Sequence, residues 1–178
     1  EAVAVSKGPG SYTGLRIGVS TAKGIAYAAS LPLIGVETTL SMFHGIDDRI
    51  RNKYGLDNRS LFIPMLDARR MEVYYSILDN EGSTVKETSA EIIDENSFTD
   101  ITADIRLLFF GDGAEKCRDI IKRENVAFAD EFRISAAHMY QPAFKSLRQQ
   151  TFEDIAYFEP FYLKDFITSR PKKNILGR

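Results

Sequence analysis

Hydrophobic and polar residues follow two different periods in the first third of the chain. Residues 2–6 alternate alanine with valine and predict a short strand, and the apolar run 31–36 predicts a buried one. Between them, a glycine-rich turn leads into small and apolar residues at helical spacing that continue to Ala29. A strand, a helix and a strand in this order predict a right-handed crossover and a parallel pair. A second helix is expected over residues 38–54, where the apolar residues fall near one face.

Beyond a polar linker at residues 57–60, the pattern changes to short strands separated by turns. The first three expected strands form an antiparallel meander, at residues 61–66, 72–78 and 84–90. Later strands are expected at 107–110, 126–128 and 161–164, and helices from Ser97, over 114–124 and over 136–149. We therefore expect two lobes: residues 1–56 as the remainder of an N-terminal lobe, and residues 57–178 as a C-terminal lobe with a basic tail.

The turn after the first strand, KGPGSYTG, is the most distinctive part of the chain. Gly8 and Gly10 permit a positive φ, while Ser11 and Thr13 offer hydroxyl groups where a helix needs an N-cap. The lysine of a Walker loop is absent, and Thr13 replaces the third glycine of the dinucleotide-binding pattern. A helix N-terminus can still hold an anion, so these four residues remain candidates for an anion-binding turn.

Small residues recur at every fourth position from this turn along the helix, at Gly10, Gly14, Gly18, Ala22 and Ala26. Glycine inside a helix costs roughly 0.5–1 kcal/mol relative to alanine, so this ridge needs a physical reason. One reason is close packing of the helix on its own sheet. The other is docking of a helix from another chain, which small residues at this spacing allow. The two interpretations can hold at different positions.

Composition and charge restrict the class of protein. Of the 178 residues, 44% are apolar, which is enough for a core, and the net charge of −2 does not indicate autonomous nucleic-acid binding. Residues 164–178 carry five basic residues and one acid, which we interpret as a solvated end, or alternatively as a weak phosphate contact. Cys117 is the single cysteine, and no signal peptide or membrane span is evident, so the cytoplasm is expected.

Two further polar groups lie in expected turns. Asp67 and Arg69 belong to the run 67–72, where turn hydrogen bonds and surface ion pairs explain the charges better than a bound ligand does. Residues 111–113, Gly-Asp-Gly, precede an expected helix, and a strand-to-helix turn with Asp112 near the N-cap is favoured over a second anion-binding turn.

The sequence predicts neither a metal site nor a nucleophile. His44 and His138 each lack a second histidine at i+4, the spacing that places two ligands on one helix face. Cys117 falls on the inward side of an expected helix, where a thiol behaves as an inert small hydrophobe. We expect no cofactor.

The segment KGPGSYTGLRIGVSTAKGIAYA closely resembles the signature of the TsaB (YeaZ) family, and LPLIGVETTLSM, IPMLDARRMEVYYSIL and EPFYLKD resemble its later motifs. The resemblance implies an α/β fold of the actin, Hsp70 and sugar-kinase type, which is ribonuclease H-like and has two lobes. Family members open with a further strand, a turn and a hairpin. Because this chain begins at Glu1 in an expected strand, we expect an N-terminally truncated first lobe.

The family resemblance also implies partners and a role. TsaB resembles its catalytic paralogue TsaD, whose metal-binding histidine pair would fall at Thr38 and Met42, so the metal ligands are expected to be absent here. The resemblance implies a non-catalytic subunit that binds TsaD, together with the ATPase TsaE, and supports threonylcarbamoyl transfer to tRNA without touching it directly. A homodimer is implied when TsaD is missing. The partner interface is assigned to Gly14, Gly18, Ala22 and Ala26.

Two other classes of function remain as alternatives. A metal-dependent peptidase of the glycoprotease type would require a metal-binding histidine pair, which the sequence lacks. An independent nucleotide-binding, kinase-like domain would require a phosphate-binding turn of the D-T-S type, which is not in this sequence.

Overall fold

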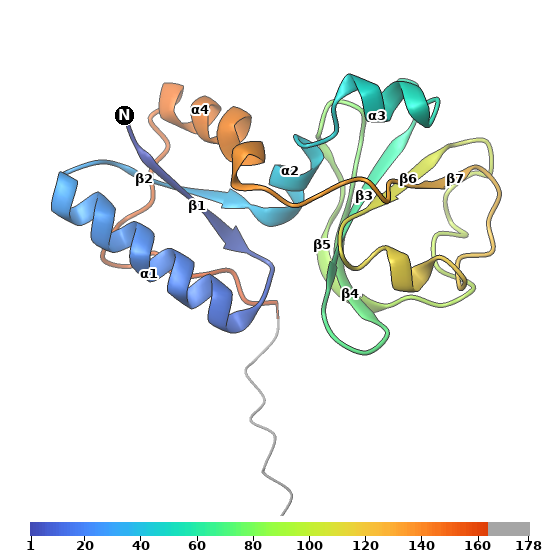
Figure 1. The fold of residues 1–178 in the computed structure, drawn as a ribbon, viewed down its shortest axis with the longest axis horizontal. Helices are drawn as coiled ribbons and strands as arrows, with labels where there is room; N and C mark the ends of the chain where they lie inside the picture. Colours follow the sequence, from blue (N-terminus) through green and yellow to red (C-terminus); the bar gives the residue numbers. More distant parts are fainter. Residues whose placement is uncertain (164–178) are drawn as a thin grey trace, which may run out of the picture.

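The computed structural model describes residues 1–163, which form two lobes side by side (Figure 1). The first lobe contains β1 (Val3–Gly8) and β2 (Leu33–Glu37), which pair in parallel. The helix α1 (Tyr12–Ala29) connects these strands and packs against β1. The predicted strand, helix and parallel strand are therefore confirmed.

The helix α1 begins and ends at residues suited to those positions. The Ser11 hydroxyl accepts a hydrogen bond from the Gly14 amide at 3.4 Å, and Ser30 closes the helix in the left-handed conformation. The buried side of α1 packs on the two strands and forms a small core with them. Its members are Val5, Val19, Ala22, Ala26, Leu33 and Phe158.

The single helix predicted over residues 38–54 is wrong. The chain instead forms α2 (Thr38–Phe43) and α3 (Asp48–Lys53), because the Asp47 carboxylate accepts a hydrogen bond from the Ile50 amide at 2.9 Å and caps a new helix. The apolar side chains of this region pack on the sheet of the second lobe. The predicted lobe boundary after residue 56 therefore lies too late in the chain.

The second lobe contains a five-stranded sheet in the order β5-β4-β3-β6-β7. Antiparallel pairing joins β4 to β3 and to β5, as the predicted meander requires, while β6 and β7 add in parallel beside β3. The strands are β3 (Leu61–Asp67), β4 (Glu72–Leu78), β5 (Thr84–Ile92), β6 (Leu107–Phe110) and β7 (Val126–Phe128).

The central strand β3 is buried on both faces of this sheet. Ile63 and Met65 belong to the core on one face, and Phe62 and Leu66 belong to the core on the other. Parallel pairing with β6 and coverage of both faces explain why the sequence of β3 is a nearly continuous apolar run.

The helices predicted from Ser97 and over residues 114–124 are wrong. Phe98 has a φ of 68°, which ends a right-handed helix, and the Arg123 guanidinium donates to the carbonyls of Phe98 and Ile101 instead of leaving them to a helix. In the second segment only the 3₁₀ turn η1 (Glu115–Cys117) forms. In the segment from Ser97, hydrogen bonds from the Arg123 side chain therefore replace the expected helical ones.

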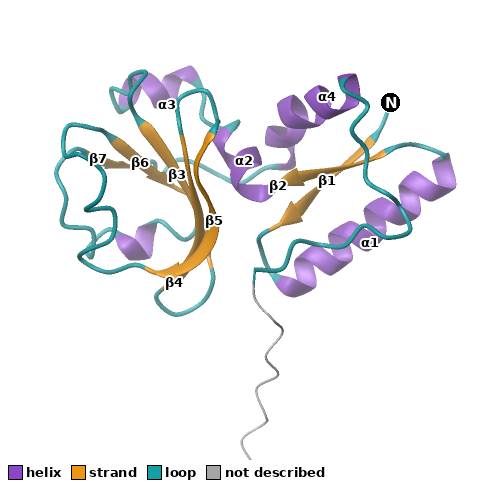
Figure 2. Ribbon diagram, turned by 180° about the vertical axis from the view of Figure 1, so that it is seen from behind, coloured by secondary structure: helices purple, strands orange, loops and turns teal. Residues whose placement is uncertain are grey.

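After β7 the chain returns to the first lobe through η2 (Ala136–Met139) and α4 (Tyr140–Arg148). α4 and α1 lie on opposite sides of the strands β1 and β2 (Figure 2). Residues 151–163, the strap, then run along the first lobe, where the Glu153 amide donates to the Leu33 carbonyl at 2.8 Å. The assignment of residues 57–178 to one lobe is therefore wrong.

The end of the chain differs from the prediction in one further respect. Residues 161–163 are not in a strand, and their backbone instead contacts the turn after β1, where the Phe161 amide donates to the Lys7 carbonyl at 2.6 Å. Lys164 and the basic tail predicted over residues 164–178 lie outside the described residues.

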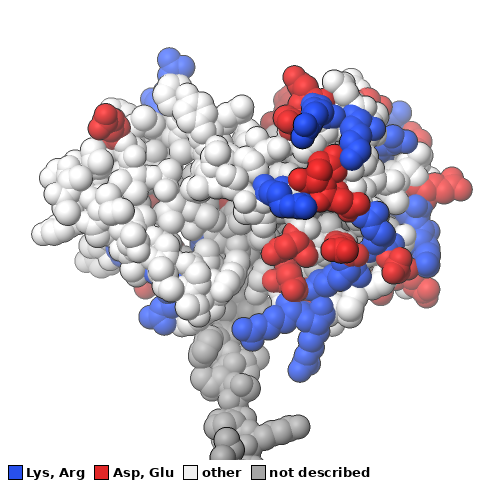
Figure 3. Space-filling model, in the orientation of Figure 1, with Lys and Arg blue, Asp and Glu red and all other residues white. Residues whose placement is uncertain are grey.

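Charge is distributed unequally between the lobes. Residues 37–131 contain 20 acidic and 12 basic residues, whereas residues 2–36 and 132–152 contain six basic residues and no Asp or Glu. In Figure 3 charged side chains of both signs crowd the second lobe, while the visible face of the first lobe is almost uncharged. The first lobe therefore offers the less charged surface.

Candidate functional site

The two lobes meet at a cleft of about 400 Å³ that is bordered by three turns. Pro9, Gly10 and Ser11 come from the turn after β1, Asp67 and Arg69 from the turn after β3, and Asp112 from the turn after β6. The carboxyl ends of strands in α/β sheets commonly border ligand sites, and this cleft brings together three motifs that are distant in sequence.

The glycine turn has structural roles that account for much of its sequence. Gly8 has a φ of 119°, and a Cβ atom there would lie 2.5 Å from the Phe161 carbonyl oxygen. Ser11 caps α1, while a Cβ on Gly10 would make only ordinary contacts with Leu15. Of the four candidate anion-binding residues, Gly10 and Ser11 line the cleft, and Gly8 and Thr13 do not.

The small-residue ridge divides into an inner and an outer part. Ala22 and Ala26 are 6% and 0% exposed and belong to the core of the first lobe. Their assignment to a partner interface is therefore wrong, and close packing explains them. Gly18 is half-buried, with its Cβ position 3.8 Å from a Val5 methyl group, and Gly14 is exposed. The docking interpretation remains open only at the outer positions.

The turn after β3 is held by Lys116, which extends from η1. Its ammonium group donates to the Asp67 carboxylate and to the carbonyls of Arg70 and Glu72, the latter two at 2.9 and 2.7 Å. The Lys116 hydrogen bond holds the pKa of Asp67 below its ordinary value. The Asp67 carboxylate also accepts from the Arg69 amide at 2.8 Å. These contacts confirm the structural interpretation of Asp67.

The side chains of Arg69 and Asp112 differ in whether they hydrogen-bond to the rest of the protein. Arg69 has a φ of 72° and lines the cleft, and its guanidinium makes no hydrogen bond to any residue within 1–163. Asp112 accepts a hydrogen bond from the Asp67 amide at 3.0 Å and so ties the turn after β6 to β3. Asp112 lies two residues before Ala114, the N-cap of η1, in the turn between β6 and η1, as predicted.

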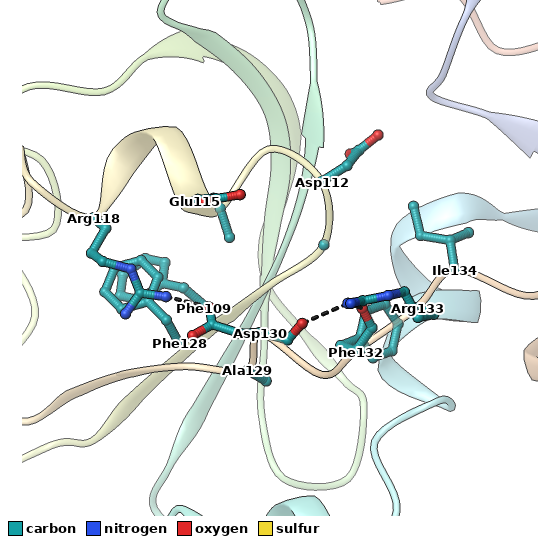
Figure 4. Close-up of a pocket in the computed structure, with 12 residues that line it drawn as sticks. Phe109, Asp112, Glu115, Arg118, Phe128, Ala129, Asp130, Phe132, Arg133 and Ile134 are labelled. Atoms are coloured by element: carbon teal, nitrogen blue, oxygen red, sulfur yellow. Dashed lines mark hydrogen bonds and ion pairs between the residues drawn. The ribbon is translucent and has the colours of Figure 1, made fainter.

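A second cavity, of about 720 Å³, opens where β6 and β7 end. Figure 4 shows the Arg118 and Arg133 side chains reaching Asp130 from opposite sides of this cavity. Arg118 also lies over the Phe128 ring at 4.4 Å, and Phe128 stacks on Phe109. The cavity is therefore lined by aromatic rings and by two arginines, of which Arg118 pairs with the Asp130 carboxylate and Arg133 donates to the Asp130 backbone carbonyl.

Both histidines lie at the junction of α2 with η2 and α4, which the sequence did not indicate. Burial lowers the pKa of His44, whose side chain hydrogen-bonds Gln141. His138 packs against Gly45 and the Phe132 ring, 5.5 Å away between ring centroids. Within residues 1–163, no group of three or more His, Cys, Asp or Glu side chains is arranged to hold a metal ion.

Thr38 and Met42, the positions that correspond to the paralogue's metal ligands, serve the packing of α2. The Thr38 hydroxyl lies 2.6 Å from the Ser6 hydroxyl, and Met42 is 1% exposed beside Gly111. Cys117 is fully buried, and its thiol donates to the Gly113 carbonyl at 3.4 Å. Burial raises the pKa of this thiol, as expected for an inert cysteine.

Sequence reasoning missed two features of this region. The strap brings Tyr162 against Tyr12 at the cleft, with ring centroids 5.1 Å apart. The outward side of α1 exposes Ile17 and Ile25, at 63% and 53%. The second feature had a signal, since both isoleucines fall off the buried stripe of the helix, whereas the first depends on a fold-back between distant segments.

Known proteins resemble the chain both in sequence and in fold. Residues 1–169 match the model of a family described as TsaD, tRNA N6-adenosine threonylcarbamoyltransferase. The tRNA threonylcarbamoyladenosine biosynthesis protein TsaB is 39% identical to the chain over 75 residues in Escherichia coli, 34% over 76 in Haemophilus influenzae and 33% over 85 in Bacillus subtilis. These matches cover 42–48% of this chain and 29–33% of the relatives, so the chain spans about a third of the curated proteins it matches.

Two solved structures share the fold. One is YeaZ from Pseudomonas aeruginosa, and the other is a protein described as similar to the peptidase YeaZ from the same organism. Both superpose with a TM-score of 0.70 at 20% identity, over 92% of this chain and 73–74% of theirs. At this identity the likeness establishes the two-lobe α/β fold alone. No helix among the described residues is both long and apolar enough to cross a membrane.

Proposed function

The chain belongs to the family of the tRNA N6-adenosine threonylcarbamoyltransferase TsaD and is related within it to the TsaB (YeaZ) proteins, and on this premise we propose that it is a non-catalytic docking subunit. It binds a TsaD-type catalytic paralogue, together with a TsaE-type ATPase, and supports threonylcarbamoyl transfer to tRNA that the partner carries out. In the absence of that paralogue it pairs with a second copy of itself. Its fold is of the actin and sugar-kinase type.

The observation that carries this proposal is a second apolar face on α1, which we call the outer stripe. At about 100° per residue, its members share roughly a third of the helix circumference and lie away from the buried face. All are exposed: Gly14, Ile17, Thr21, Gly24, Ile25 and Ala28. Ile17 and Ile25 expose more than half of their surface, and the stripe contains no charged residue.

The chemistry of the outer stripe suits a helix from a partner. The glycines lower the surface so that a second helix can approach closely, and the isoleucines supply apolar area on either side. A Cβ atom on Gly24 would meet nothing within 4 Å, so packing inside this chain does not account for that glycine. An exposed apolar face on a helix otherwise buried on one side is typical of a protein interface.

The proposal of a non-catalytic role is supported by how the paralogue's metal-ligand positions are occupied. Thr38 and Met42 offer a hydroxyl and a thioether, which are poor substitutes for two imidazole ligands on a borderline cation. Both side chains are engaged in packing, at 9% and 1% exposure.

The proposal is tested by placing charge on the outer stripe. In the double variant Ile17→Glu, Ile25→Glu, two carboxylates would have to be desolvated on docking, so affinity for the TsaD-type partner should fall at least about 100-fold. The measurement is co-purification, with dissociation constants from calorimetry. Circular dichroism should show an unchanged fold, because both side chains are exposed.

Tyr27→Glu provides the matched control. Tyr27 lies on the same helix, is 80% exposed and faces away from the outer stripe, so this variant should still pair. Undiminished pairing of the double variant would refute the docking role of α1. Equal loss in both variants would show that charge anywhere on the helix is disruptive, and would refute the assignment to the outer stripe.

A further inference from the structure

The exposed side of α4 carries a column of stacked groups. The Tyr140 and Phe144 rings lie 5.7 Å apart at an interplanar angle of 15°, and the Arg148 guanidinium lies over the Phe144 ring at 5.4 Å. Tyr140 is 68% exposed and Phe144 44%. Tyr140, Phe144 and Arg148 are each four residues apart, and residues at this spacing lie above one another on a helix. The Tyr140 end of the column is open to solvent.

Cations and amides surround this column. Lys145, Gln141 and Gln149 line the same shallow hollow of about 440 Å³. The side chains of Lys145 and Arg148 make no hydrogen bond or ion pair with any residue that the structure describes, although the Arg148 guanidinium lies over the Phe144 ring. The hollow therefore combines aromatic faces, unpaired positive charge and amide groups.

The other cations of the acid-free segments 2–36 and 132–152 are already engaged. Lys7 pairs with Glu37 at 3.6 Å, Lys23 donates to the Ala156 and Phe158 carbonyls, and Arg133 donates to the carbonyls of Asp130 and Phe132. Arg16 donates to the Tyr12 hydroxyl. Of the six cations in these two segments, only Lys145 and Arg148 have side chains without a hydrogen bond or ion pair to a described residue.

We propose that this face of α4 binds unpaired bases of RNA. A base would continue the column by stacking on Tyr140, Lys145 and Arg148 would neutralise phosphates, and the Gln149 amide would meet a base edge. Aromatic platforms beside cations are how proteins hold single-stranded nucleic acid, and the absence of acidic residues from 132–152 removes repulsion of phosphates. This inference rests on the proposed function, because it assigns a contact for the tRNA.

A peptide is the competing occupant, because the opposite border of α4 is an apolar groove. Its lining includes Ala2, Ala4, Ile34 and Ala143, together with the edges of Tyr140 and Phe144. An apolar peptide in that groove would gain nothing from Lys145 or Arg148. Binding that depends on Lys145 and Arg148 would therefore indicate RNA, and binding that does not depend on them would indicate a peptide.

The test is fluorescence anisotropy of the purified chain with a labelled single-stranded RNA of about ten nucleotides, with duplex RNA as competitor. We expect Tyr140→Ala to weaken binding about tenfold and Tyr140→Phe to bind as the original chain does, because only the ring is needed. Arg148→Gln should weaken binding and lower the slope of log affinity against log salt by about 0.7. Arg49→Gln is the matched control: Arg49 is exposed on α3 in the second lobe, and its loss should change nothing.

Other outcomes overturn either the RNA proposal or the docking role. Absence of RNA binding, equal weakening by Arg49→Gln, or binding that Tyr140→Ala leaves intact would exclude α4 as an RNA surface. Loss of pairing with the TsaD-type partner in Tyr140→Ala, without RNA binding by the original chain, would assign this face to a protein. Failure of the outer-stripe variants to affect pairing, with RNA binding on α4 retained, would refute the docking role alone.

Discussion

The two lobes are stabilised in different ways. The second lobe has a five-stranded sheet with an apolar core on each face, and its members all come from residues 42–132. The first lobe has a two-stranded sheet and a small core that Phe158 of the strap completes. Two strands alone are marginal in water, so the first lobe depends on a segment from the other end of the chain. The core of the second lobe thus comes from one continuous stretch of sequence. The core of the first lobe needs a residue that lies more than 100 positions further along the chain.

The comparison also concerns surfaces. The second lobe carries most of the charge of both signs, whereas the first lobe exposes an apolar face on α1 and an aromatic, cationic face on α4. Both proposed binding surfaces therefore lie on the lobe with the smaller core.

The largest expected effect is on the second lobe, at Gly111. A methyl group there would overlap the Met65 carbonyl oxygen and the Met42 Cε atom, and the φ of 102° disfavours any side chain. Gly111→Ala should lower the free energy of unfolding by on the order of 3 to 5 kcal/mol, measured by urea titration. Gly24→Ala is the control, with open space around its Cβ position, and should raise stability by roughly 0.5–1 kcal/mol. A neutral Gly111→Ala would show that the close approach of β6 to β3 is not required.

The next effect separates the lobes. Phe158→Ala removes a ring that is 9% exposed from the core of the first lobe and should cost about 3 kcal/mol there. Hydrogen exchange should quicken in β1 and β2 and stay unchanged in β3 and β6. Tyr157→Ala, at a neighbouring side chain that is 83% exposed, should change neither. Equal acceleration in both lobes would contradict the dependence of the first lobe alone on the strap.

The smallest effect concerns pH and the turn after β3. Lys116 lowers the pKa of Asp67 in the folded chain, so their interaction stabilises the fold above the unfolded pKa of about 4 and is lost as the pH falls through the lowered folded value. Because Asp67 is half-exposed, Lys116→Met should cost only about 1 kcal/mol at pH 7.

The readout for this variant is the free energy of unfolding between pH 7 and pH 2. The loss of stability on acidification should be shallower in Lys116→Met than in the original chain, and Lys122→Met, at an exposed lysine of the same segment, should leave the profile unchanged. Parallel profiles for the original chain and Lys116→Met would contradict the coupling.

The hydrophobic pattern predicted secondary structure correctly where each element is determined by residues close to it in sequence. The strands β1 to β7 and the first crossover follow from alternation, apolar runs and turn residues. The errors arose where a distant or competing polar group decides the backbone. Asp47 splits a periodic helix, and Arg123 captures carbonyls that a helix would have used. The return of α4 to the first lobe has no local signal, because its own sequence is compatible with packing on either lobe.

The candidate site was predictable in part. The glycine turn, Asp67 and Asp112 were identified as motifs, but only the fold shows that Gly10, Asp67 and Asp112 border one cleft. The sequence left open which residues of the ridge pack internally, and all four from Gly14 to Ala26 were assigned to the partner interface, because spacing alone does not distinguish the buried side of a helix from the exposed side. Ala22 lies in the core, while Ile17, three residues from Gly14, lies outside it.

The strap has a consequence for biosynthesis. The strands β1 and β2 and the helix α1 have been translated by residue 37, but Phe158, which closes their core, follows about 120 residues later. At a translation rate of about 5–20 residues per second, the apolar side of α1 remains uncovered by Phe158 for on the order of ten seconds. By then all residues of the second lobe have been translated. During that interval the second lobe can be folded while the core of the first lobe is still incomplete. Chaperone binding or premature termination would therefore affect the first lobe selectively.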